Sequence, residues 1–444
     1  MKPNTHEIVI MKKFITAFLF IMFSFVSVVA QDSLTLEQAV ELALKNNYAI
    51  SIARSQAAVA NNNNNIGNAG FLPSLAINAS TSSSNNITTQ DYFTGTSINK
   101  TSAISSILNS GAALNWTIFD GLKMFATKAK LEELEEQGMI HLKIEIENTI
   151  VKITTAYFDI VRQQQLIKAT KDAIEINKER VNVAQLRFDI GSISKMDLLL
   201  AKVDLNTQKS LLFKQNSELN NAKTTLNQLL SKSVNSDFIA KDNIIVDYKP
   251  VYADLQKMVN NKNNQLLSAQ KNIAIANSSL KEQNSLRLPN VDLNATYNFS
   301  QIKNQVGLVL LNKNLGLNTG ITASWTLFNG FKNNTHIKSA RYLVEQNKLE
   351  FQQLNSQLES SLLKAFVTYT NLLEMLKLEE ENAVVAKESV SYALERFEIG
   401  NNNTIELMTA QKNYQDALSR LIAARYEAKL SETELKRLEG ALVK

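Results

Sequence analysis

The chain has 444 residues, 47 basic and 42 acidic side chains, a net charge of +5, and no cysteine. Without cysteine there is no disulfide framework, thiolate metal site or cysteine nucleophile. The three histidines are scattered, which argues against a histidine zinc site or a Ser-His-Asp triad. The charge is mild and evenly spread, so it predicts no binding to nucleic acid. We expect no metal, no cofactor, no catalytic residue and no enzyme activity.

Residues 1–30 have the pattern of a cleaved signal peptide. Lys12 and Lys13 precede the apolar run 14–30, which ends in small residues before Gln31. The alternative is an uncleaved signal anchor, but this run is shorter than the roughly 20 residues that a spanning helix needs. Translation starts at either Met1 or Met11. No later segment is apolar enough to predict a transmembrane helix.

The rest of the sequence contains two similar copies of one unit. The segment Trp116–Gly121 (WTIFDG) recurs 209 positions later as Trp325–Gly330 (WTLFNG). Arg187–Gly191 (RFDIG) recurs at the same 209-residue shift as Arg396–Gly400 (RFEIG). A period this long indicates two copies of one large unit rather than an array of small repeats. We predict a first repeat over 31–240 and a second over 241–444.

Each repeat begins with a predicted helix, over about 34–71 in the first copy, and continues with a strand pair. The strand pairs cover 74–119 and 290–329, where apolar and polar residues alternate with period two, most clearly from Val291 to Ser300. The polar stretches 81–107 and 301–316 are predicted to be surface loops between the paired strands.

Two very long helices are predicted after the strand pairs, over 122–188 and 331–397. At 1.5 Å per residue each is about 100 Å long, which no compact domain holds. Apolar residues recur along both at strict seven-residue steps, from Ile146 to Phe188 in the first copy, which is typical of coiled-coil seams. Tight turns lead to shorter helices over 194–230 and 403–439. A layered helical cylinder satisfies these lengths.

Four strands with one apolar face cannot stand alone in a bilayer, because their edges would leave backbone groups unpaired. A dimer would give eight strands and a filled interior, whereas a trimer would give twelve and leave a lumen. Trp116, Phe119, Trp325 and Phe328 are candidate membrane-interface aromatics. The alternative is that they pack a soluble sheet against a helix.

Taken together, these features resemble the outer-membrane efflux protein family, the TolC-like outer-membrane factors. The resemblance rests on the segment 34–47 (LTLEQAVELALKNN), on Leu72-Pro73, and on both copies of the Trp-Thr-x-Phe-x-Gly and Arg-Phe-x-x-Gly motifs. It covers 34–440. It implies a mainly α fold with a small β part. Long coiled-coil hairpins would form an α-barrel, and four strands per chain would enter a 12-stranded transmembrane β-barrel of a homotrimer.

The resemblance also implies a function and partners. The chain would be a passive outer-membrane exit duct of a tripartite efflux or type I secretion system, with a large periplasmic portion. Its partners would be outer-membrane lipid, a periplasmic adaptor (membrane fusion) protein, and an inner-membrane pump of RND, ABC or MFS type. The exported substrate, whether drug, metal or protein, stays open.

In that family the turns after the long helices form the periplasmic tip, where the adaptor binds. The resemblance therefore assigns docking at the tip to Arg187, Phe188, Gly191, Arg396, Phe397 and Gly400. Glycine suits the left-handed turn that ends a helix. For both arginines the alternative role is to cap the last carbonyls of their helices.

Asp197 and Glu406 follow the two turns and are candidates for an entrance constriction. A trimer would bring six such acids around one opening, where they would exclude anions or bind cations. The spacing from Ser194 to Asp197 and from Asn403 to Glu406 also matches a capping box, and acids in a first helical turn are favoured by the helix dipole. The two roles are compatible.

Two other functional classes fit the sequence less well. A secreted structural coiled-coil scaffold without a pore would explain the heptads but not the amphipathic strands. A glycosidase-like enzyme would need a pair of carboxylates in one cleft, and nothing in the sequence places two there.

Overall fold

The computed structural model describes residues 33–399 and 404–442. The predicted signal peptide over 1–30, Gly400 and Asn403 lie outside the described residues. The chain forms two compact units. Unit 1 contains the described residues up to Lys45, Lys152–Val246 and Glu374–Leu430, and unit 2 contains Asn46–Val151, Asp247–Leu373 and the remainder from Ser431. Each unit thus takes segments from both predicted repeats.

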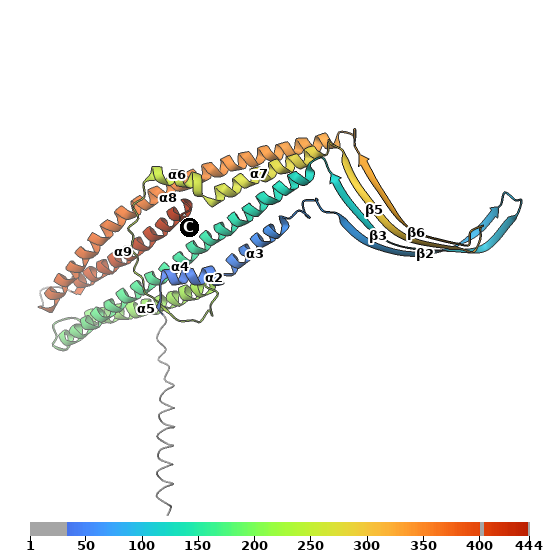
Figure 1. The fold of residues 1–444 in the computed structure, drawn as a ribbon. Helices are drawn as coiled ribbons and strands as arrows, with labels where there is room; N and C mark the ends of the chain where they lie inside the picture. Colours follow the sequence, from blue (N-terminus) through green and yellow to red (C-terminus); the bar gives the residue numbers. More distant parts are fainter. Residues whose placement is uncertain (1–32, 400–403, 443–444) are drawn as a thin grey trace, which may run out of the picture. The chain divides into compact units, whose positions relative to one another are not determined.

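The fold is mainly helical, and its longest elements are α4 (Lys123–Asp189) and α8 (Lys332–Glu398), with 67 residues each. Each begins one residue later than the sequence predicts. The residues before them, Leu122 and Phe331, have φ angles of +70° and +63°, a left-handed conformation that a helix cannot include. The helices that follow the turns, α5 (Lys195–Leu229) and α9 (Thr404–Leu438), have 35 residues each. Figure 1 shows α5 returning beside α4 and α9 beside α8 within unit 1.

The predicted single helix over 34–71 is wrong, because the structure has two shorter helices there. They are α2 (Leu36–Asn46) and α3 (Tyr48–Asn63), separated by Asn47 in an extended conformation. The side chain of Asn47 accepts hydrogen bonds from the backbone N–H groups of Ala49 and Ile50, so it caps the new helix. The second repeat has the same break: α6 (Tyr252–Lys262) and α7 (Asn264–Ser285) are separated by the N-cap Asn263.

Unit 2 contains a four-stranded antiparallel sheet of order β2-β3-β5-β6 (Figure 1). Its strands are β2 (Ser74–Asp91), β3 (Ser97–Phe119), β5 (Asn290–Asn304) and β6 (Leu311–Ser324). The central pair joins the two repeats, with Trp116 opposite Leu293. The strands β2 and β6 are the edges of this sheet.

The predicted loops over 81–107 and 301–316 are wrong, because most of these residues are strand. β2 and β3 pair through to Asp91 opposite Ser97, and β5 and β6 pair through to Lys303 opposite Leu311. Serine, threonine and asparagine on both faces hide the alternation there, yet backbone pairing does not require apolar side chains. The strand predicted to reach 329 ends at Ser324, since its partner β5 begins only at Asn290, after Pro289.

One face of the sheet is apolar. Register places Leu293, Tyr297 and Phe299 of β5 opposite Ile321, Leu317 and Leu315 of β6, all on the same face because residues two apart point the same way. Leu315, Leu317 and Ile321 are 64–70% exposed, as are Leu75 and Ile77 of β2 at 71% and 82%. The chain itself therefore leaves this apolar face largely uncovered.

The predicted seven-residue column of α4 is confirmed as a packing seam in unit 1. Ile153 and Ile160 are completely buried, and Ile167 and Ile174 nearly so. A second buried column lies three residues further along, and its members include the polar residues Gln163, Thr170 and Asn177. Sequence patterning of apolar residues alone does not detect this second column.

Tyr157 fixes the N-terminal segment against the core of unit 1. The short strands β1 (Ser33–Leu34) and β4 (Ile239–Ala240) pair in parallel beside it. Its ring is completely buried, and its hydroxyl lies 2.6 Å from Asp242 Oδ2 and 2.9 Å from the Leu34 carbonyl oxygen. The same carboxylate oxygen accepts from the Leu36 backbone N–H at 2.7 Å. Burial raises the pKa of Tyr157 well above its ordinary value.

Replacing Tyr157 with Phe should lower the thermal unfolding midpoint, because the lost hydrogen bonds are worth about 1–2 kcal/mol when buried. A raised tyrosine pKa means that this stability is present below about pH 10 and is lost as the pH rises further. The difference between wild type and Y157F should therefore shrink above pH 10 in thermal melts. The matched control Y342F, at a 76%-exposed tyrosine, should leave the midpoint unchanged; equal shifts in both variants would contradict the assignment.

Arg180 ties three helices of unit 1 together two turns before the end of α4. Its side chain is 1% exposed and forms an ion pair with Asp204 of α5 at 2.5 Å. It also donates to Gln411 Oε1 of α9 at 3.2 Å. A buried guanidinium is costly to leave unpaired, so the position of α5 and α9 against α4 depends on these partners.

The variant D204A should lower the thermal midpoint by the equivalent of about 2 kcal/mol, because it leaves the Arg180 charge buried without its counter-ion. The double variant R180M/D204A should recover most of that loss, since it removes both charges and keeps an unbranched side chain of similar length. A double variant less stable than D204A would show that the ion pair does not explain the effect.

Candidate functional site

The turn after α4 has the geometry expected of Gly191. The φ of Gly191 is +75°, its N–H donates to the Phe188 carbonyl at 2.9 Å, and the N–H of Ser192 donates to the Arg187 carbonyl at 2.7 Å. These two bonds are the Schellman motif, which satisfies carbonyls that a helix end leaves free. Phe188 packs on a small cluster formed by Ala184, Leu198 and Ala201, which joins α4 to α5.

The two arginines of the repeated motif have different partners. Arg187 donates to the backbone carbonyl of Phe397, and its guanidinium carbon lies 4.6 Å from the centroid of the Phe397 ring. Phe397 itself is 2% exposed. The first-copy arginine therefore caps the long helix of the second copy, which combines the capping role with a contact between the two hairpins.

Arg396 instead forms an ion pair with Glu406 at 3.9 Å, and both side chains are more than half exposed. This pair lies in an open groove of about 680 Å³ between α8 and α9, whose exposed apolar lining includes Val385, Tyr392 and Ile405. An ion pair this exposed stabilises the fold little.

Asp197 has the capping geometry. Its backbone N–H donates to Ser194 Oγ at 3.2 Å, while its carboxylate accepts from the Ser194 backbone N–H at 3.2 Å and from Ser194 Oγ at 2.7 Å. This is a complete capping box at the start of α5. The corresponding cap in the second copy would involve Asn403, which lies outside the described residues.

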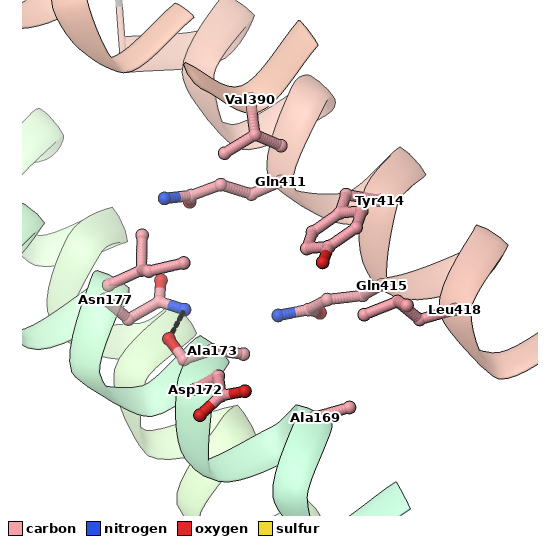
Figure 2. Close-up of a pocket in the computed structure, with 10 residues that line it drawn as sticks. Ala169, Asp172, Ala173, Asn177, Val390, Gln411, Tyr414, Gln415 and Leu418 are labelled. Carbon is pink, nitrogen blue, oxygen red and sulfur yellow. Dashed lines mark hydrogen bonds between the residues drawn. The ribbon is translucent and has the colours of Figure 1, made fainter. Parts of the chain in front are cut away.

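A small cavity with both polar and apolar lining lies between α4 and the α8–α9 pair, as Figure 2 shows. Its volume is about 30 Å³, and Asn177 and Ala173 of α4 face Gln411, Tyr414 and Gln415 of α9 across it. The Nε2 group of the buried Gln411 has no partner in the structure. Burial and the charge of Asp172 raise the pKa of Tyr414, which keeps its hydroxyl protonated. The cavity suits one or two water molecules and is far too small for an organic substrate.

Both tryptophans hold the junction between a short helix and the first strand of their repeat. The indole N–H of Trp116 donates to the Phe71 carbonyl at 2.9 Å, and that of Trp325 donates to the Arg287 carbonyl at 3.0 Å. Each acceptor directly precedes a Leu-Pro pair, so the same bond is made in both repeats. The sequence showed the Trp and Leu-Pro motifs but not that they bond to each other.

The aromatic residues of this motif differ in their surroundings. Phe119 ends β3, opposite Val291, whereas Trp325 and Phe328 follow the end of β6 and are 60% and 73% exposed. Phe328 packs edge-to-face on Phe331, with ring centroids 5.4 Å apart. Gly121 is required in the first copy: its φ is +71°, and a Cβ would lie 2.5 Å from the Ser285 carbonyl oxygen.

Sequence reasoning missed Arg180, Asp204 and Gln411, which connect α4, α5 and α9 behind the turn. The only available signal was an arginine beside an otherwise apolar heptad column. In the part of the chain that the structure describes, no helix combines the length and the apolar character needed to cross a membrane. Across residues 33–399 and 404–442, no three His, Asp or Glu side chains are arranged to hold a metal ion.

The matches to known proteins extend over both copies of the repeated sequence. The family model described as "Outer membrane efflux protein" matches residues 39–232 and 255–441. The outer membrane efflux protein BepC of Brucella suis is 18% identical over 411 residues, covering 92% of this chain and 86% of BepC. The outer membrane protein TolC of Escherichia coli is 20% identical over 381 residues, covering 84% of this chain and 75% of TolC.

The fold is shared with solved channels. The CmeC outer membrane channel of Campylobacter jejuni superimposes with a TM-score of 0.78 at 17% identity, covering 91% of this chain and 85% of CmeC. The chain is thus an outer-membrane protein with an efflux-channel fold. Because the family model matches most of both repeats, the chain belongs to the outer membrane efflux protein family.

Proposed function

We propose that the protein is the passive exit duct of a tripartite efflux or type I secretion system. In this role three copies form a 12-stranded β-barrel in the outer membrane, and the long hairpins form an α-barrel in the periplasm. The observation that carries the proposal is the four-stranded sheet of unit 2, which has one exposed apolar face and two edge strands. Unpaired strand edges are not tolerated in lipid, so the edges must pair with other copies.

A trimer is the smallest closed assembly that leaves a passage. Three copies of the four strands give twelve, whereas two copies give eight, whose interior is filled by side chains. The face opposite the apolar one supports a wet lumen: on β6 it carries Asn312, Asn314, Gly316, Asn318 and Thr322.

The turn region of unit 1 supports adaptor docking. The groove between α8 and α9 combines exposed apolar side chains with the exposed Arg396–Glu406 pair, a composition that suits a helical partner with complementary charge. We assign docking to this groove and to the turn formed by Arg187, Phe188 and Gly191. On the repeated sequence motif alone, the same role is proposed for Gly400, which lies outside the described residues. The energy for export would come from an inner-membrane pump of RND, ABC or MFS type.

The absence of natural cysteine allows a direct test of the trimer by cross-linking. We expect I77C in β2, combined in turn with L311C, L317C or A323C in β6, to give a covalent trimer with a flexible bis-maleimide in membranes. These three partners sample the whole of β6, because the register between copies is not fixed by a single chain. Each single-cysteine variant is the control and should give no trimer. Failure of all three combinations, in protein that fractionates with the outer membrane, would contradict edge-to-edge closure.

The acids after the turns should give the duct a cation preference. The variant D197N/E406Q removes the two charges while asparagine and glutamine keep hydrogen-bonding capacity at the helix starts, so the fold should persist. In planar bilayers under a salt gradient, we expect its reversal potential to move toward zero. The control E345Q/E350Q removes the same charge from exposed positions of α8 and should behave as wild type. An unchanged reversal potential in D197N/E406Q would leave only the capping role for these acids.

A further inference from the structure

Two lysines interrupt the apolar face of the sheet at the end distant from the helices. On β5 this face runs from Val291 to Phe299 and then carries Gln301 and Lys303. On β6 it runs from Ala323 to Leu315 and then carries Lys313 and Leu311. Lys303 and Lys313 are the only charged side chains on this face of β5 and β6, both of which are described throughout.

The depth of the lysines matches the edge of a bilayer. A strand crosses the hydrocarbon core in about 9–11 residues when tilted. Lys313 lies ten residues from Ala323, and the segment from Val291 to Phe299 spans nine residues. The two ammonium groups therefore lie where hydrocarbon gives way to headgroups, if the apolar face meets lipid as the proposed function requires.

The two lysines are close enough to act on one group. Lys303 is opposite Leu311 and Lys313 is opposite Gln301, which makes the lysines diagonal neighbours, and such residues lie about 7–8 Å apart in an antiparallel pair. Their four-carbon stems can lie on apolar side chains while the ammonium groups extend into the polar layer. Both are exposed, and neither forms an ion pair with a carboxylate among the described residues.

We propose that Lys303 and Lys313 form a binding site for the phosphate of an anionic lipid headgroup on the outside of the barrel. The unbalanced positive charge needs a counter-charge at this depth, and the neighbouring Leu315 and Leu317 provide a surface for the acyl chains of the same lipid. The ligand class is a phosphate-bearing anionic lipid, and the inference rests on the proposed membrane-spanning sheet.

The test compares spin-labelled phosphatidylglycerol with spin-labelled phosphatidylcholine around the purified protein in phosphatidylcholine vesicles. Electron spin resonance reports the lipid held at the protein surface. The wild type should prefer phosphatidylglycerol, and K303Q/K313Q should reduce this preference by about fivefold for each lysine removed. The control K338Q/K364Q removes the same charge from exposed positions of α8 and should keep the wild-type preference.

The other outcomes of this experiment each overturn or support the lysine site. A preference that survives in K303Q/K313Q, or that falls equally in K338Q/K364Q, overturns the site. Loss of the preference in sodium phosphate, but not in sodium chloride at equal ionic strength, would support the site, because free phosphate would then compete with the headgroup phosphate for the two lysines. Failure of the proposed function has a different signature, because no immobilised lipid of either kind would then be seen with any variant.

Discussion

The main physical constraint on this fold is that backbone N–H and C=O groups must be paired wherever lipid replaces water. One chain supplies only four strands, and its edges β2 and β6 carry unpaired backbone on their outer sides. The apolar face of the sheet cannot be buried within the chain either, since Ile77 and Ile321 remain more than two thirds exposed. The proposed closure with further copies in a bilayer would remove both deficits in the same step.

The duplication of the sequence explains how one chain forms this four-stranded sheet with two open edges. Each repeat supplies one strand pair, and β3 and β5 join the pairs at the centre of the sheet. Repeated local devices hold the helices to the strands: an indole bond to the carbonyl before each Leu-Pro pair, and an asparagine cap within each short-helix segment. The copies differ at the turns, where Arg187 contacts Phe397 while Arg396 pairs with Glu406. The arginine of nearly the same motif therefore makes a packed contact in one copy and an exposed ion pair in the other.

The sequence predicted the features that depend on periodicity and missed those that depend on partners. The long helices follow from apolar heptads, and their starts differ by one residue only because Leu122 and Phe331 are left-handed. The outer halves of β2 and β3 were predicted to be loop, because Ser, Thr and Asn on both faces leave no alternation to read. Their strand structure comes from backbone pairing across the hairpin, which side-chain hydropathy does not encode.

The core of the helical part also contains a feature that apolar periodicity does not predict. The column from Ile153 to Ile174 is visible in the sequence, but the second column contains Thr170 and Asn177 and resembles a solvent-facing stripe. Burying it requires polar partners from other helices, and the Gln411 amide and the adjoining small cavity show that its hydrogen bonding is incomplete. Where a side chain of such a polar seam lacks a protein partner, a bridging water can supply the hydrogen bond at little cost. In the proposed duct, this polar seam is therefore the part of the helix packing that could rearrange with water as a substitute partner, while the apolar column beside it holds the helices together.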